Sequence, residues 1–234
     1  ITTMALQITH HKNFNVEAVG FSKLRKNKNG GKAVYLNVSD KKLYLQLPKL
    51  RSPYGLSTYT DDSSGKTSYS LDLSLDTDNT EAMDLREKLT QLDDLIIKTV
   101  VENSKEWLGK KFNEAVCREA LYKPLVRQGK EPYPDTIKLK ILANDKGEFV
   151  PEAYNTNREQ VGLDTVSKGS KVTCIVDMVQ IWFIDNKFGV TVRLQQALLE
   201  PSAKLPSFAF VGVEGSNEAQ AEDEFVDEDE EYEE

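Results

Sequence analysis

The sequence has few residues of the types that build metal and redox sites. Its 234 residues include two cysteines, Cys117 and Cys174, and two adjacent histidines, His10 and His11. These four residues lack the regular spacing of zinc-binding motifs, so the sequence predicts no metal site. Both cysteines fall in stretches typical of a helix or a core strand, which favours reduced, buried thiols in an intracellular protein.

Long hydrophobic runs are also absent. The sequence contains no stretch of about eighteen apolar residues, so we expect no membrane-spanning helix. Residues 1–15 include no apolar segment of the kind found in secretory signals, and we expect Met4 to be the natural start of the chain.

The sequence lacks the common catalytic motifs as well. The Walker phosphate-binding loop, GxGxxG, HExxH and GxSxG are all missing. Asp72, Asp76 and Asp78 come nearest to an acidic metal-binding set, but the first two alternate on a strand face that we expect to be solvated. We therefore expect neither enzymatic activity nor a cofactor.

Negative charge is abundant but unevenly distributed. The net charge is −8, yet residues 214–234 hold twelve acidic residues and no basic one. Of the 38 acidic residues, 26 remain in residues 1–213 against 30 basic residues, which gives that part a charge of about +4. The sequence therefore predicts a domain over residues 4–213 and a disordered acidic tail over residues 214–234.

The clearest structural pattern lies between Gly169 and Glu200. Two runs rich in β-branched and aromatic residues flank a short turn, DNKFG, which predicts a long antiparallel hairpin. In the second run, residues 188–194 alternate between a core face and a polar face that carries Arg193. The first run is apolar on both faces past Met178, which indicates a central strand or a bulge that exchanges the faces.

Other segments show strand and helix periods. Alternation predicts strands at residues 33–38, 41–47, 67–76 and 136–142, and a return strand from residue 149 to 154 that forms a hairpin with 136–142. On 67–76, the side chains expected to face outward are Ser70, Asp72, Ser74 and Asp76. Leucine, isoleucine and valine at spacings of three and four predict one long helix over about 80–106, with Thr80 as its N-cap.

Basic and aromatic residues are interleaved in the predicted loops. Arg51 and Tyr54 share a proline-flanked loop, and Trp107 precedes the Gly-Lys-Lys segment at 109–111. Lysine and arginine neutralise phosphates. Aromatic faces stack on bases, and each stacked base contributes about 1–3 kcal/mol. Plainer explanations stay open: the lysine-rich segment 23–32 as a solvated turn, Trp107 as a cap on the core, and the tail as a solubilising segment.

Five segments carry a family resemblance: PKLRSPYGLS (48–57), YSLDLSL (69–75), NSKEWLGKKF (103–112), YPDTIKLKI (133–141) and the IW-turn-G hairpin (181–189). In this order they resemble the single-stranded-DNA-binding proteins of nucleocytoplasmic large DNA viruses, which are similar in plan to the bacteriophage T7-type single-stranded-DNA-binding protein. The resemblance implies an OB-fold barrel with an inserted helix and an acidic tail, no enzymatic activity, no required cofactor and a homodimer. The T7-type tail ends in an aromatic residue, whereas this chain ends in Tyr-Glu-Glu.

These patterns and the resemblance predict a mainly β protein: an OB-fold-like antiparallel barrel elaborated by extra hairpins and one long helix. We expect it to coat and protect single-stranded DNA in viral DNA replication and recombination, without sequence specificity, in the replication compartment of the infected cell. Its acidic tail is expected to regulate binding and to contact replication proteins such as DNA polymerase or helicase. The residues expected to face DNA are Arg51, Tyr54, Trp107, Lys110, Lys111, Lys138, Lys140, Trp182 and Arg193. Two other hypotheses stay open, a virion or assembly protein and a histone-chaperone-like protein, each using the tail to bind basic partners.

Overall fold

The computed structural model describes residues 6–201, 205 and 208–213. The expected start at Met4 and the predicted acidic tail, residues 214–234, lie outside the described residues. The chain divides into two units, Ile1–Pro201 and Ser202–Glu234. In the described part of the second unit, the rings of Phe208 and Phe210 meet edge to face with their centroids 5.5 Å apart.

Five strands of the first unit close into a ring, as the predicted barrel requires. The ring runs through β13 (Lys171–Ile184), β6 (Leu50–Arg51), β8 (Thr67–Ser74), β10 (Thr136–Ile141) and β14 (Lys187–Leu199), which pairs again with β13. A five-stranded barrel of this size is the plan of the OB fold. The junction of β10 with β14 is parallel, so the barrel is mixed and not purely antiparallel as predicted. Parallel pairing needs a crossover connection, which the long segment between the two strands supplies.

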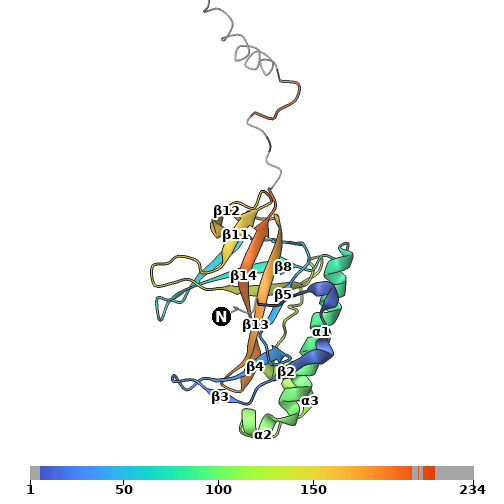
Figure 1. Ribbon diagram of the computed structural model, residues 1–234, viewed down its shortest axis with the longest axis vertical. Coiled ribbons are helices and arrows are strands. Elements are labelled where there is room, and N and C mark those ends of the chain that lie inside the picture. Colours follow the sequence, from blue (N-terminus) through green and yellow to red (C-terminus); the bar gives the residue numbers. More distant parts are fainter. Residues whose placement is uncertain (1–5, 202–204, 206–207, 214–234) are drawn as a thin grey trace, which may run out of the picture. The chain divides into compact units, whose positions relative to one another are not determined.

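Shorter strands extend this ring. Four add to β13 and its neighbours: β1 (Ile8–His10), β2 (Val19–Phe21), β4 (Lys32–Val38) and β5 (Leu43–Gln46). Five others lie at the margins: β3 (Arg25–Lys26) on β4, β7 (Leu56–Thr60) on β8, β9 (Tyr122–Lys123) and β11 (Glu152–Asn155) on β14, and β12 (Gln160–Val161) on β11. In Figure 1, the β3–β4 hairpin and the loop that joins β7 to β8 both project to the left of the β13–β14 hairpin.

The long hairpin has the form that the sequence predicts. β13 and β14 are joined by Asp185 and Asn186, whose φ angles of 49° and 63° match the left-handed turn that suits a twisted hairpin. β13 is a central strand, and the register shifts between Met178 and Gln180, so both readings of its two-sided apolar pattern are confirmed.

One long helix packs on the barrel. α1 (Thr80–Glu102) buries a stripe of side chains: Leu85, Leu89, Leu92, Ile96 and Val100. Its N-cap is one residue earlier than predicted, because the side chain of Asn79, not Thr80, accepts the hydrogen bond from the Ala82 amide at 3.2 Å. The helix ends at Glu102, before the predicted end at about 106. Within the described ranges, no helix is long and apolar enough to cross a membrane.

Short helical pieces complete the unit. They are η1 (His11–Asn13), η2 (Val16–Ala18), α2 (Ser104–Trp107), α3 (Glu114–Val116), the π-helical turn η3 (Cys117–Leu121) and η4 (Leu163–Thr165). The segment after η3 is fixed to α1 by Asp93, whose carboxylate accepts hydrogen bonds from the Tyr122 hydroxyl and from the Leu125 amide. Burial raises the pKa of Asp93.

Two local predictions are wrong. Residues 136–142 and 149–154 do not form a hairpin: a single bridge joins Ala143 to Phe149, and β11 pairs in parallel with β14. On β8, the outward Ser74 is buried, since the Arg51 side chain donates a hydrogen bond to its hydroxyl. Both errors arise from pairing with strands that are distant in sequence.

Candidate nucleic-acid interface

A row of cross-strand partners on the outer face of the sheet carries an aromatic ring between two basic residues. Side chains that are directly opposite each other on neighbouring strands point to the same face. Five strands are aligned so that Arg25, Ala33, Trp182, Gly189 and Lys123 follow one another across the sheet. We call this row the tryptophan row.

The two small residues of this row make room for the indole. Ala33 is fully buried, and a Cβ atom placed on Gly189 would lie 2.7 Å from Cζ2 of Trp182. The half-buried indole therefore lies against the Gly189 backbone. Lys123 Nζ is 5.7 Å from the Trp182 ring centroid, a distance at which a cation is attracted to an aromatic face.

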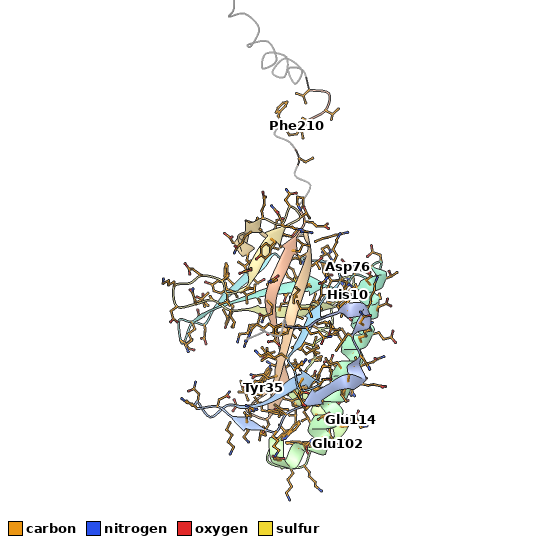
Figure 2. The ribbon with its side chains drawn as sticks, viewed as in Figure 1. His10, Tyr35, Asp76, Glu102, Glu114 and Phe210 are labelled. Carbon is orange, nitrogen blue, oxygen red and sulfur yellow. The ribbon has the colours of Figure 1, made fainter. Side chains whose placement is uncertain are left out.

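A second aromatic ring is next to the tryptophan row. Tyr35 is opposite Gln180 on β13, two residues along from Trp182, and the Arg25 guanidinium carbon is 5.3 Å from its ring centroid. Figure 2 shows Tyr35 at the base of the projecting β3–β4 hairpin. Two half-buried aromatic rings with adjacent cations thus occupy neighbouring positions on one face.

A second row lies further along the same face and carries three charged residues. Tyr44, Asp177, Arg193, Lys140 and Ser70 are aligned across five strands, and we call them the charged row. Asp177 is only 2% exposed. Burial raises its pKa, and the nearby positive charges of Lys42 and Arg193 partly offset this effect.

Two polar atoms in or beside the charged row are buried without a partner among the described residues. They are Arg193 Nε and Asp72 Oδ1. Lys138 is opposite Asp72, and Lys138 and Lys140 are exposed, as the alternation on β10 predicts. The face therefore presents two exposed lysine ammonium groups above a partly buried layer of charge.

Two further tyrosines are exposed, and one of them lies on the outer face near the β7–β8 loop. Tyr54 is 56% exposed and Tyr59 is 68% exposed. Tyr59 lies on β7 opposite Ser68, on the same face of the sheet as Ser70 and Lys140. Sequence reasoning missed Tyr59 because its short strand lies between polar loops; it also missed Tyr35, Tyr44 and Lys123, which only the strand register brings together.

Trp107 is a correction to the predicted set. Its side chain is 5% exposed, and its ring meets Phe183 edge to face at a centroid distance of 5.9 Å. A ring in this position cannot stack on a base. The alternative that Trp107 covers the core is confirmed, because the helix that carries it folds back against β13.

Arg51 is already engaged within the protein. Its Nε and Nη2 atoms donate to both carboxylate oxygens of Asp76, at 3.0 and 2.7 Å. This pairing holds the pKa of Asp76 below its usual range and raises that of Arg51. Figure 2 shows Asp76 beside the upper part of α1, at a distance in the view from Tyr35. The structure gives Arg51 a bridging role between β6 and the end of β8.

The other predicted lysines lie in a loop at the far end of the hairpin. Lys110 and Lys111 are exposed, and Lys110 Nζ is 5.0 Å from the Phe112 ring centroid. The residues just before them, Trp107 and Leu108, help to line a cavity of about 550 Å³ beside the β13–β14 turn. These lysines are therefore near the projecting β3–β4 hairpin, although no strand register joins them to the two rows.

Neither cysteine has the features of a reactive thiol. Burial raises the pKa of Cys174 to about 12 and also raises that of Cys117. Over the described ranges, no cluster of three or more histidine, cysteine, aspartate and glutamate side chains is arranged to hold a metal ion.

The fold and this face together define a small β-barrel protein of OB plan with an aromatic and basic outer surface. The chain belongs to DUF5871, a family of unknown function, whose pattern matches residues 70–211. A comparison with curated protein sequences gives no match.

Solved structures of similar fold come from bacteriophages. The gp2.5 single-stranded-DNA-binding protein of bacteriophage T7 is 14% identical, with a TM-score of 0.46 over 82% of this chain and 99% of that chain. The single-stranded-DNA-binding protein of bacteriophage Enc34, in complex with ssDNA, is 10% identical, with a TM-score of 0.41 over 79% and 97%. Without DNA, the Enc34 protein is 13% identical, with a TM-score of 0.41 over 86% and 97%. At this distance the likeness carries no argument about what the chain binds, and the expected kinship with proteins of large DNA viruses stays a prediction.

Proposed function

We propose that this protein binds single-stranded DNA on the outer face of its barrel. The tryptophan row is the observation that carries the proposal, because it places a half-exposed indole between Arg25 and Lys123. Stacking of a base on an aromatic face contributes about 1–3 kcal/mol and tolerates any base. The two cations on either side are placed to neutralise the phosphates of the same strand.

The arrangement favours a single strand over a duplex. In a duplex the faces of the bases are covered by their neighbours, so Trp182, Tyr35 and Tyr44 have nothing to stack on. An unpaired strand that follows β13 meets the tryptophan row first and the charged row about 15–20 Å further on, from the rise of about 3.3 Å per strand residue. Arg193 and Lys140 then contact its backbone.

We further propose that the protein coats single-stranded DNA during replication and recombination and that its acidic tail regulates binding. The support is the charge division of the sequence, with twelve acidic residues in 214–234 and a positive body. A tethered acidic segment competes with DNA for the same cations at high effective concentration. Once DNA displaces it, the tail is free to bind basic surfaces of replication proteins.

Tryptophan fluorescence tests the DNA-binding proposal directly. The sequence has two tryptophans, and Trp107 is buried, so we expect oligo-dT to quench mainly Trp182. The Trp107→Phe variant should keep the quench, and the Trp182→Phe variant should lose it. Failure of oligo-dT to bind the intact chain at low salt would reject the proposal.

A truncation after Val213 tests the role of the tail. The truncated chain should bind oligo-dT more tightly than the full chain at low salt, and the difference should shrink as salt screens the tail. Equal affinities at every salt concentration would show that the tail does not compete with DNA.

A further inference from the structure

A second feature of the outer face is a cavity of about 320 Å³ at the end of the β13–β14 hairpin that is remote from the turn. Ile175 on its floor is two residues before Asp177 of the charged row, and both side chains face outward. At about 3.3 Å per residue, the cavity lies about 7 Å beyond that row. Volumes from about 300 Å³ upward are typical of small-molecule sites.

The floor of the cavity alternates amide and aliphatic side chains. Gln46, Ile175 and Gln196 are aligned across three strands. Neighbouring strands are about 4.8 Å apart, so the two glutamine backbones are about 10 Å apart with Ile175 between them. Each amide offers both a donor and an acceptor, and neither side chain is hydrogen-bonded to another residue in the described part of the chain.

An aromatic wall and a cation border this floor. The half-buried Tyr154 lines the cavity, and its hydroxyl donates a hydrogen bond to the Glu152 carboxylate, which holds the ring in place. Arg158 lies at the exposed rim in the turn between β11 and β12. The Asn155 side chain fixes this turn by accepting a hydrogen bond from the Glu159 amide at 3.0 Å.

We propose that this cavity takes one nucleobase of the bound DNA strand, an inference that rests on the proposed function. The base lies over Ile175 against Tyr154, with its polar edges toward Gln46 and Gln196. Arg158 contacts the adjoining phosphate. Because amide pairs distinguish bases by their donors and acceptors, this site gives a base preference to a face that otherwise binds any sequence.

The test compares affinities for oligo-dT, oligo-dC and oligo-dA at one salt concentration. The variant replaces both amides, Gln46→Leu with Gln196→Leu, which keeps side-chain size and removes hydrogen bonding. The matched control is Gln91→Leu, at an exposed position of α1. For each protein we take the ratio of its affinities for two oligonucleotides, and we compare this ratio between the wild type and the variants. Any structure in the free oligonucleotides affects every protein equally, so it does not change this comparison.

We expect the wild type and the control to prefer one homopolymer by about fivefold or more, the lower end of what one amide–base pair contributes. The double variant should bind all three within about twofold. Equal ratios in the wild type and the double variant would overturn the base site while oligo-dT binding still supports the proposed function. Absence of binding to all three by the wild type would overturn both.

A second readout uses 2-aminopurine placed in oligo-dT. Stacking on Tyr154 should quench its fluorescence in the wild type, and Tyr154→Ala should reduce the quench while oligo-dT affinity falls by less than about tenfold. An unchanged quench in Tyr154→Ala would show that no base lies against this wall.

Discussion

The indole of Trp182 lies so close to Gly189 that a single methyl group on Gly189 would meet three ring atoms, at 2.7, 3.0 and 3.2 Å. The two residues are directly opposite each other on β13 and β14. Glycine is needed here for space rather than for an unusual backbone angle. The orientation of the ring is therefore coupled to the side chain of one residue on the neighbouring strand.

The Gly189→Ala variant tests this coupling. The added methyl group should lift the indole from the sheet and weaken oligo-dT binding by about tenfold, or ~1.4 kcal/mol, within the range for one stacked base. Circular dichroism should show an unchanged fold, because alanine is compatible with this part of the strand. An affinity equal to the wild type would show that the ring position does not matter for binding.

The two tryptophans should separate binding from stability. Trp182→Ala should weaken oligo-dT binding with little change in the denaturation midpoint, since its ring is half-exposed. Trp107→Ala should lower the free energy of unfolding by about 3–5 kcal/mol, as large buried aromatic deletions do. Oligo-dT affinity and the free energy of unfolding are measured for both variants. If Trp107→Ala weakened binding and Trp182→Ala lowered stability, the stacking surface would lie at Trp107.

Lysines on the outer face should set the salt dependence of binding. Each phosphate contact to a single strand contributes about −0.7 to the slope of log affinity against log salt. Lys123→Ala and Lys140→Ala should each make the slope shallower by roughly that amount. Lys98→Ala, at an exposed position on α1, is the matched control and should leave the slope unchanged. If all three variants changed the salt slope equally, the lysines would attract DNA through overall charge and not through contacts along a defined DNA path.

Much of the fold follows from local sequence patterns. The alternation at 67–76 and 136–142 predicts β8 and β10, and the paired runs around DNKFG predict the β13–β14 hairpin. These patterns are informative because each strand has one face toward the core. The parallel pairing of β10 with β14 and of β11 with β14 was not predictable, since no turn fixes the register of strands so far apart.

The candidate site was less predictable for the same reason. Residue type selected Trp182, Arg193, Lys138 and Lys140, which lie on the outer face, but it also selected the buried Trp107. Helical periodicity stops before Trp107, so the sequence leaves open both a stacking ring and a cap on the core. Lys123 and Trp182 come together only through β9, a strand of two residues.

The Arg51–Asp76 pair should contribute to stability in a pH-dependent way. Asp76 has a folded-state pKa below its unfolded value, which is about 3.9. The folded state therefore binds this proton less readily, so the contribution is fully present above about pH 4 and is lost as pH falls through the lower folded-state pKa. Asp76→Asn should reduce stability at neutral pH and flatten its decrease in acid.

Urea denaturation of the wild type, Asp76→Asn and the control Asp62→Asn, at an exposed position, measures this contribution at neutral and acid pH. Asp93 changes stability in the opposite direction, because its raised pKa makes the folded state take up a proton first on acidification. That effect is common to all three proteins and cancels in the comparison.

Arg51→Ala should match Asp76→Asn in stability and bind oligo-dT as the wild type does. A selective loss of DNA binding in Arg51→Ala would instead restore Arg51 to the interface, as the sequence predicted.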